Sequence, residues 1–363
     1  MRFIHVASYK DEFFNGIKSV LMELIPAQRA LGHDVWILNH ELNNCPVIEG
    51  EMYVDSFREF TTIINTVKPD FVLFHSLYGL KDVLFSYYLR FRRIPYLVEP
   101  HGGTSKENAK KNAVKKKIAN IVYANSFIHH AAGIIYLNEK EKDECVFANI
   151  RSNYAVIPNG THLHGLVEKS ESLDIIKFIF LARIDVVQKG LDLLFPAIKK
   201  INKYGLKDKV EFHFYGKARQ PQSKLLFDEY IEAASGNVYY HGPAIGKDKE
   251  KAFEDGDIFI LTSRYEGMPM AVLEALSFGL PCLLTRQTNL TNLIEKYNCG
   301  WITETSVERI CESIVFAIDD FKQRKSQLRL NALEAVKPFD WNAIAEKSIQ
   351  EYTRLIRQIK INA

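Results

Sequence analysis

The sequence predicts an α/β protein made of two doubly wound, Rossmann-like domains, and three observations support this fold class. Short runs rich in β-branched and aromatic residues alternate with amphipathic helical stretches, which is typical of parallel sheets covered by helices. This alternation occurs in each half of the chain. The length of 363 residues is more than one hydrophobic core usually supports. We therefore expect two sheets, in two domains that face each other across a cleft.

Strands are expected in both halves. In the first half they are Arg2 to Ser8, Asp34 to Leu38, Phe71 to His75, Tyr96 to Glu99 and Gly133 to Tyr136. In the second half they are Ile175 to Ala182, Val210 to Tyr215, Val238 to Tyr240, Ile258 to Thr262 and Cys282 to Thr285. Between the two patterns, the polar stretch Gly165 to Leu173 lacks a periodic apolar face and is the expected linker.

The expected domain borders follow from this division. An N-terminal domain is expected at residues 1–165 and a C-terminal domain at residues 166–345. Asp340 and Trp341 open an amphipathic helix that runs to about Gln358. We expect residues 346–363 to be a helix that returns to the N-terminal domain.

Composition excludes several classes of protein. The net charge of +3 lacks the basic bias of a dedicated nucleic-acid binder. No apolar run reaches membrane-spanning length, and Met1 to Val6 has the pattern of a first strand rather than a signal peptide. The five cysteines are scattered and lack C-x-x-C spacing, which predicts reduced packing residues. We expect a cytoplasmic protein.

Two glutamates, Glu266 and Glu274, are the strongest candidates for a ligand site. Glu274 is the only charged residue from Pro269 through Thr285, so its helix should be mostly buried. A carboxylate there is costly unless other groups donate hydrogen bonds to it, and neighbouring sugar hydroxyls could be those donors. The alternative is an ion pair with an Arg or Lys of another element.

The residues between the two glutamates favour an anion. Gly267 permits close approach of the backbone, and Pro269 suits the first turn of a helix, where free amides and the positive dipole end attract a phosphate. One carboxylate could then bind a sugar and the other a ribose, with the helix start facing the phosphates between them.

Basic residues follow another strand end of the second domain, and strand ends are where doubly wound sheets bind ligands. Arg183 follows the strand that ends at Ala182, and Lys189-Gly190 opens the next helix. A planar Arg fork with a mobile Lys suits a diphosphate. The alternative is a surface ion pair for Arg183 and a solvated Lys189.

Two candidates lie in the first half. His101 and two glycines follow a buried strand, and the imidazole could hydrogen-bond a sugar hydroxyl or be a structural cap. Asn15-Gly16 precedes the helix Ile17 to Ala30. Its backbone amides could approach a phosphate or an acceptor, although an ordinary turn explains the pair equally well.

Together these residues resemble the retaining nucleotide-sugar glycosyltransferases of glycosyltransferase family 4, which have the two-domain GT-B fold. The resemblance covers nearly the whole chain and rests on the order and spacing of the motifs. They are Asn15-Gly16, His101-Gly102-Gly103, Val156 to Gly160, Leu181-Ala182-Arg183 with Lys189-Gly190, Asp257 to Ser263, the glutamate pair, and Gly279-Leu280-Pro281.

The resemblance implies a role for each donor-side residue. Arg183 and Lys189 would hold the donor diphosphate and stabilise charge on the leaving group. Glu274 would bind the ribose, and Glu266 the transferred sugar. The backbone of four consecutive residues would touch sugar and phosphate, namely Gly267, Met268, Pro269 and Met270.

On the other side, His101 would contact the donor sugar near the reacting carbon, and Gly16 would line the cleft towards the acceptor. The chain departs from the family pattern at two places. The family often has Gly-Gly where this chain has Asn15-Gly16, and Val-Asp where it has Thr161-His162.

A retaining transfer could use a covalent glycosyl-enzyme or a front-face attack in which the leaving phosphate takes the acceptor proton. Glu99 is the only carboxylate at the His101 strand end, and strand alternation predicts that it points away from the neighbours of His101. We therefore expect front-face attack. Asp255-Gly256-Asp257 precedes a strand and is interpreted as a turn and strand start, so no metal and no cofactor is expected.

The stretch from Lys106 to Lys117 has a single acid, Glu107. It contains six lysines, namely Lys106, Lys110, Lys111, Lys115, Lys116 and Lys117. It could be a solvated helix face, or it could bring the protein to an anionic membrane surface. The aromatic-rich Leu84 to Arg93 could belong to the same face or to a core helix.

We thus expect a transferase that moves a sugar, from a uridine diphosphate sugar before other donors, to a glycan or lipid-linked acceptor in polysaccharide biosynthesis, such as lipopolysaccharide or capsule. It could act at the inner face of the membrane. A nicotinamide oxidoreductase is disfavoured because no G-x-G-x-x-G follows the first strand. A nucleotide-sugar epimerase, a phosphorylase and a non-catalytic sugar-nucleotide-binding protein are the alternatives.

Overall fold

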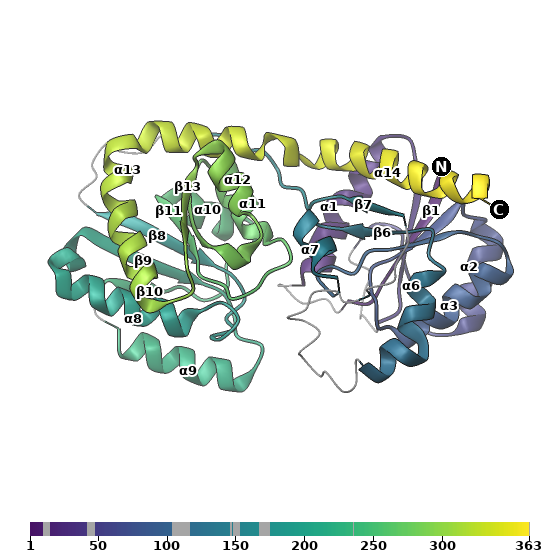
Figure 1. Cartoon of the computed structure of the whole chain (residues 1–363), viewed down its shortest axis with the longest axis horizontal. Coiled ribbons are helices and arrows are strands. Elements are labelled where there is room, and N and C mark those ends of the chain that lie inside the picture. The colour runs from purple at the N-terminus through teal and green to yellow at the C-terminus, as the bar shows by residue number, and fades with distance from the viewer. Residues whose placement is uncertain are drawn as a thin grey trace. The chain divides into compact units, whose positions relative to one another are not determined.

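The computed structural model describes residues 1–9, 15–41, 48–103, 117–145, 147, 153–166, 175–234 and 236–362. The chain forms two compact units, unit 1 from Met1–Gly160 with Trp341–Ala363, and unit 2 from Thr161–Asp340. Each unit contains one parallel sheet with helices packed on it (Figure 1). The predicted class of two doubly wound α/β domains is confirmed.

In unit 1 the sheet order is β3-β2-β1-β4-β5-β6-β7, and every pair is parallel. The strands are β1 Arg2–Ala7, β2 Asp34–Asn39, β3 Glu51–Tyr53, β4 Phe71–Phe74, β5 Tyr96–Val98, β6 Gly133–Tyr136 and β7 Tyr154–Val156. The chain moves outward from β1 to β3 and then crosses to β4 on the other side. The ends of β1 and β4 therefore flank the switch point, where such sheets bind ligands.

Helices cover both faces of this sheet. They are α1 Gly16–Ala30, α2 Phe57–Val67, α3 Leu80–Phe91, η1 Asn120–Ala124, α6 Asn125–His129, α7 Glu139–Asp143 and α14 Trp341–Asn362. α14 packs on α1, so the C-terminal helix belongs to unit 1 as predicted (Figure 1). Phe3 and Phe71 stack in the core, and Tyr352 of α14 meets the edges of both rings.

In unit 2 the order is β10-β9-β8-β11-β12-β13, again with parallel pairs only. The strands are β8 Ile176–Leu181, β9 Val210–Tyr215, β10 Val238–Tyr240, β11 Ile258–Leu261, β12 Cys282–Thr285 and β13 Gly300–Thr303. The switch point lies between β8 and β11. β11 is fully buried and β8 is buried except at Lys177, as expected for a parallel sheet with both faces covered.

The helices of unit 2 include the long α13, which packs against α8 and α11. They are α8 Leu191–Ile201, η2 Asn202–Leu206, η3 Lys207–Lys209, α9 Pro221–Glu232, α10 Lys247–Asp255, α11 Met270–Ser277, η4 Arg286–Thr288, α12 Thr291–Tyr297, α13 Val307–Val336 and η5 Lys337–Phe339. No helix within the described ranges is long and apolar enough to cross a membrane.

The units divide five residues before each of the predicted borders at 165 and 345. The reason is local pairing. The chain passes from one unit to the other after Gly160 and again after Asp340. The Thr161 N–H donates to the carbonyl of Phe339 at 2.8 Å, and Thr161 forms an isolated β-bridge with Asp340, so the two boundaries lie next to each other. On the unit 1 side, Gly160 lies against the Trp341 ring so closely that an added Cβ would be 2.5 Å from it. Most of the predicted linker, residues 167–173, lies outside the described residues.

Candidate functional site

The site in unit 2 is centred on an ion pair between Lys189 and Glu266. Lys189 Nζ lies 2.5 Å from Glu266 Oε1, and each side chain is only 10% exposed. Ser263 Oγ donates to the same oxygen at 2.5 Å. The pair sits at the switch point, because Lys189 precedes α8 and Glu266 follows β11. The sequence analysis proposed a solvated Lys189 as the alternative, and the structure contradicts that alternative.

Backbone contacts fix Lys189 to the end of β11. Thr262 Oγ1 donates to the Lys189 carbonyl at 3.0 Å. Gly190 has a φ of +65°, and an added Cβ would be 2.1 Å from the Thr262 carbonyl oxygen. Only glycine fits there. The Lys-Gly motif therefore holds the start of α8 against β11 and presents the ammonium group at the strand ends.

Arg183 lies after β8 and has a half-buried guanidinium. One of its nitrogens donates to Gln188 Oε1 at 2.7 Å. Among the described residues no carboxylate pairs with it, so the predicted alternative of a surface ion pair is also wrong. A guanidinium has five N–H donors, so most of this group remains available to an anion.

The loop before α11 carries the remaining donor-side residues. Pro269 occupies the N-cap of α11 without a side-chain hydrogen bond, and no acid lies in the first turn. Met268 is buried, whereas Gly267 and Met270 are half-buried. Asn289, at a φ of +62°, donates to the carbonyls of Glu266 and Gly267 at 2.6 and 3.2 Å. The helix start thus has the geometry of an anion site.

Glu274 faces a cation of a neighbouring helix. Lys249 Nζ on α10 lies 2.7 Å from Glu274 Oε1, and the carboxylate is 19% exposed. This ion pair is the alternative that the sequence left open, with Lys249 as the partner. It does not exclude a ribose as a further partner, because the second carboxylate oxygen accepts from no group in the described chain.

In unit 1 the site residue His101 ends a chain of buried hydrogen bonds. His101 Nε2 lies 2.8 Å from His75 Nδ1, and His75 Nε2 lies 2.7 Å from His5 Nδ1. His5 Nε2 lies 3.0 Å from Gln28 Oε1, and the Gln28 amide donates to Ser348 Oγ at 2.9 Å. This series of hydrogen bonds therefore runs from the switch point, at the ends of β1 and β4, to α14.

The direction of these bonds follows from their α14 end. Ser348 Oγ donates to the Ala345 carbonyl, so it accepts from the Gln28 amide, whose oxygen must accept from His5. Burial lowers the pKa of His5 to about 4 and that of His101 to about 4. Neutral imidazoles carry one N–H each, so each ring donates through Nε2. His101 is left with Nδ1 as an acceptor.

Glu99 is the group that faces this acceptor, which corrects the prediction that it points away. Its carboxyl oxygens lie 3.6 Å from His101 Nδ1 and 3.5 Å from His75 Nδ1. The strand β5 ends at Val98, so the alternation assumed for Glu99 stops one residue before it. Burial, together with the nearby Glu141, raises the pKa of Glu99 to about 8. At neutral pH the carboxyl is therefore protonated.

His75, Glu99 and His101 also offer ligand atoms within 4.8 Å of one another, a spacing that suits a metal ion. However, His75 Nδ1 and His101 Nε2 already share a hydrogen bond, and the third group, the carboxyl of Glu99, is protonated. One imidazole–imidazole hydrogen bond and a neutral carboxyl thus account for the cluster, and the absence of a required metal stays a prediction.

The structure places Asn15 and Gly16 at the start of α1. Asn15 is the N-cap of α1, and its side chain accepts from the Lys18 N–H at 3.3 Å. An added Cβ at Gly16 would meet no atom within 4 Å. The pair starts a helix, and its contact with an acceptor stays a prediction.

Residues 176–320, which include the unit 2 site, match the family described as Glycosyl transferases group 1. Unit 2 is a glycosyltransferase group 1 domain. The match includes Arg183, Lys189, Glu266 and Glu274, so the unit 2 site lies wholly inside it. 

Relatives and solved structures agree with this assignment. The chain is 25% identical over 288 residues to N,N'-diacetylbacillosaminyl-diphospho-undecaprenol alpha-1,3-N-acetylgalactosaminyltransferase of Campylobacter jejuni, covering 74% of this chain and 73% of that protein. It is 26% identical over 281 residues to UDP-Gal:alpha-D-GlcNAc-diphosphoundecaprenol alpha-1,3-galactosyltransferase of Escherichia coli, covering 71% and 68%. Sucrose-phosphate synthase from Thermosynechococcus elongatus superposes with a TM-score of 0.79 at 18% identity, over 99% of this chain and 100% of that one. The two-unit fold is GT-B.

Two residues that position the glycosyltransferase site were not found from the sequence. Arg264 forms a bidentate salt bridge with Asp192, at 2.7 Å for each nitrogen, and so holds the loop that carries Glu266 to α8. A single Arg among many gave no signal in the sequence.

Asp257 accepts from the Lys177 N–H at 3.0 Å at the start of β8, in line with its interpretation as a strand-start residue.

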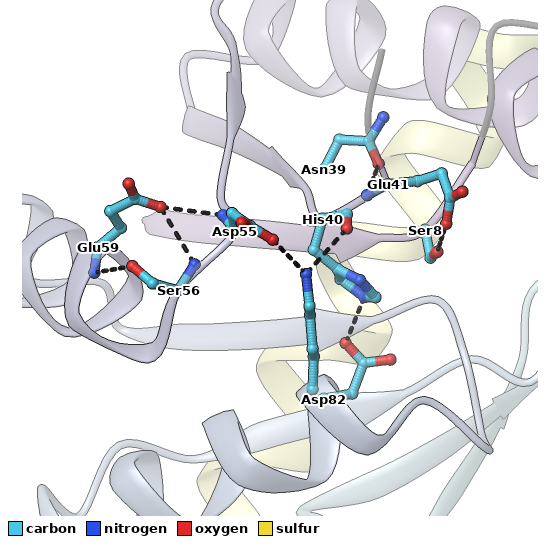
Figure 2. Close-up of polar contacts among 9 residues, drawn as sticks. Ser8, Asn39, His40, Glu41, Asp55, Ser56, Glu59 and Asp82 are labelled. Atoms are coloured by element: carbon cyan, nitrogen blue, oxygen red, sulfur yellow. Dashed lines mark hydrogen bonds and ion pairs between the residues drawn. The ribbon is translucent and has the colours of Figure 1, made fainter.

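Further polar residues line the strand ends of the glycosyltransferase's unit 1. Figure 2 shows His40, after β2, bonded through Nε2 to Asp82 at 2.9 Å. Ser8, after β1, donates to Glu41 at 3.3 Å, and Asp55, after β3, pairs with Lys81 at 2.8 Å. A capping box of Ser56 and Glu59 starts α2. This edge of the sheet is thus polar at the strand ends, where doubly wound sheets bind ligands.

The structure describes only the last residue of the lysine-rich stretch. Lys117 is exposed, and the other five lysines lie outside the described residues, at positions 106, 110, 111, 115 and 116.

Proposed function

We propose that this protein is a retaining glycosyltransferase that moves a sugar from a uridine diphosphate sugar to a lipid-linked saccharide or glycan in cell-surface polysaccharide biosynthesis. One observation carries the proposal. The buried pair of Lys189 and Glu266 lies beside the uncapped start of α11, in a unit where Arg183 follows the neighbouring strand β8. Two cations and a helix start suit a diphosphate, and a carboxylate suits the sugar.

The ion pair would exchange partners when the donor binds. Lys189 would turn from Glu266 to a phosphate oxygen, and the freed carboxylate would accept hydroxyl groups of the sugar. A cation about 4 Å from a phosphate charge contributes roughly 4 kcal/mol at an effective dielectric constant of 20. Arg183 and Lys189 together would therefore stabilise the leaving diphosphate without a metal.

The chemistry at Glu99 favours front-face attack over a covalent intermediate. A nucleophilic carboxylate must be ionised, whereas burial raises the pKa of Glu99 to about 8. Its oxygens also face two imidazoles rather than open space. We therefore propose that the leaving phosphate takes the acceptor proton, and that Glu99 and His75 orient His101.

The donor and acceptor classes rest on the relatives. The Escherichia coli relative is named for a uridine diphosphate sugar, and both relatives are named for undecaprenol-linked substrates. We extend this chemistry to the present chain and propose that it works at a membrane surface. The lysines from Lys106 to Lys117 would add attraction to anionic lipid.

The proposal predicts that uridine diphosphate stabilises the protein in the presence of a chelator. At 100 times its dissociation constant a ligand adds roughly 2.7 kcal/mol to the free energy of unfolding. Thermal unfolding with uridine, guanosine and adenosine diphosphates, each with and without EDTA, measures this. Loss of the shift in EDTA would show that a metal is needed. An epimerase or a non-catalytic binder would pass this test, so mass spectrometry of the products must show sugar transfer.

The two glutamates should separate in a second test. Glu274→Gln should weaken binding of free uridine diphosphate at least tenfold, because one neutral amide replaces the proposed ribose acceptor. Glu266→Gln should keep diphosphate affinity within about threefold and depress transfer. Calorimetric titration with the diphosphate measures both affinities. Equal losses in the two variants would refute the division of roles.

Lys249→Met is the matched control for this test. It removes the cation that pairs with Glu274 but leaves the carboxylate itself. If Glu274 binds ribose, this variant should retain the diphosphate. If it loses affinity as Glu274→Gln does, the ion pair rather than the carboxylate matters.

A further inference from the structure

The helix α3 exposes a stripe of large apolar side chains. Leu80, Leu84, Tyr87 and Phe91 recur at spacings of four, three and four residues, which places them on one face of the helix. All four are exposed, and Phe91 is 82% exposed. The opposite face packs into the core through Val83, Phe85 and Leu89. The stripe is therefore not a by-product of a poorly buried helix.

A second apolar segment lies beside the start of α3. Ile118, Ile121 and Val122 are exposed, with Ile121 at 73%. The next residue, Tyr123, turns inward and its hydroxyl donates to the carbonyl of Tyr78, two residues before α3, at 3.3 Å. The two segments thus meet at this point. We call the seven exposed side chains the apolar face, and they are Leu80, Leu84, Tyr87, Phe91, Ile118, Ile121 and Val122.

The exposed charges on the two segments that carry the apolar face are basic, and Asp55, an exposed acid of a neighbouring element, is paired with Lys81 at 2.8 Å. Arg90, Arg92, Arg93 and Lys117 are exposed on the same two segments. Within residues 79–93 and 117–130 the single acid is Asp82, which is fully buried and bonded to His40 and Ser76. A face that joins aromatic and aliphatic side chains to arginine and lysine, on two segments without an exposed acid, complements an anionic lipid surface.

We propose that the apolar face, with its flanking cations, docks unit 1 on an anionic lipid bilayer. This inference deepens the proposed function, since it names the surface that would bring the protein to a lipid-linked acceptor. The apolar side chains would enter the boundary between head groups and acyl chains, and the cations would meet the lipid phosphates. Tyr87 suits that boundary because its ring is apolar and its hydroxyl stays hydrated.

The test compares two double variants of the full-length protein. Leu84→Ser with Phe91→Ser changes the apolar face, whereas Phe316→Ser with Leu330→Ser changes two exposed apolar residues of α13 in unit 2. Phe316 is 62% exposed, which makes it a fair match for Phe91. Sedimentation with vesicles of phosphatidylcholine containing phosphatidylglycerol measures the partition coefficient. We expect at least a tenfold loss for the first variant and less than a twofold change for the control.

The charge component has its own variant. Arg90→Gln with Arg93→Gln should bind these anionic vesicles several-fold more weakly than the parent, and mostly at low salt, because screening acts within about 10 Å at 0.1 M. Binding to pure phosphatidylcholine should hardly change. An equal loss on both vesicle types would contradict the role given to the arginines.

Three results would overturn the proposal. The parent could fail to bind vesicles, or Leu84→Ser with Phe91→Ser could bind as well as the parent. The apolar face could also prove to join two copies, if the parent is a dimer that this variant converts to a monomer without vesicle binding. Vesicle binding needs neither donor nor acceptor, so its failure leaves uridine diphosphate binding and sugar transfer untouched. Conversely, loss of the proposed function would leave vesicle binding standing.

Discussion

Lys189→Met is expected to lower the free energy of unfolding by about 3 kcal/mol and to abolish stabilisation by uridine diphosphate. The substitution leaves the Glu266 carboxylate, 10% exposed, with only Ser263 as a hydrogen-bond donor to the oxygen that Lys189 contacted. Removing one partner of a buried ion pair costs about 3 to 5 kcal/mol, because the other charge stays buried without compensation. Urea unfolding with and without the diphosphate measures both effects.

The double variant Lys189→Met with Glu266→Gln is the control that separates stability from binding. It removes both charges, so most of the lost stability should return, and the difference between the single and double variants gives the coupling energy. Diphosphate binding should stay absent, because the cation is still missing. A double variant that regains diphosphate binding would place the phosphates away from Lys189.

The candidate site residues of unit 2 could be predicted to lie close together because they follow the strand ends of a predictable sheet. Once β8 and β11 are assigned as neighbours in a doubly wound sheet, Arg183, Lys189 and Glu266 must converge. The short strands were harder. β3 and β7 have three residues each, too few to establish an alternating pattern, and β13 begins with Gly300. These strands extend the sheets at their edges and do not alter the switch points.

The partners of the site residues were not predictable in the same way. Lys249 is one of several lysines on α10, and nothing in its neighbours indicates that it meets Glu274. Gln28 and Ser348 are 320 residues apart, and their bond exists only because α14 returns to α1. Glu99 was misplaced because strand alternation was carried past the last residue of β5. Local patterns predict elements, whereas such contacts depend on how the elements pack.

The buried cluster around Glu99 should give the protein a stability maximum near pH 6.5 that one substitution can alter. Burial lowers the pKa of His5 and of His101 to about 4, and it lowers that of His75 as well. The unfolded chain binds protons at these imidazoles below about pH 6.5, so the folded state loses stability as the pH falls from there. In this pH range the protons that the unfolded chain binds at three imidazoles outnumber the one proton that the folded state keeps at the Glu99 carboxyl.

Above pH 6.5 the sign reverses, because Glu99 becomes the dominant group. Its carboxyl keeps a proton in the folded state up to about pH 8, whereas the unfolded chain releases it near pH 4.5. The folded state then binds more protons than the unfolded state, so stability falls as the pH rises towards 8. The slope is about 1.4 kcal/mol per pH unit for one group.

Glu99→Gln should remove this alkaline slope, since an amide resembles the protonated acid in shape and, like it, carries no charge. Urea unfolding at pH 6 and pH 8 should show the variant gaining about 2 to 3 kcal/mol relative to the parent between the two values. Glu346→Gln, which removes an exposed carboxylate of α14, should leave the parent's slope unchanged. If Glu99→Gln keeps the parent's slope, the carboxyl is already ionised at neutral pH. A covalent route through Glu99 would then have to be reconsidered, because an ionised Glu99 would have the charge state of a nucleophile.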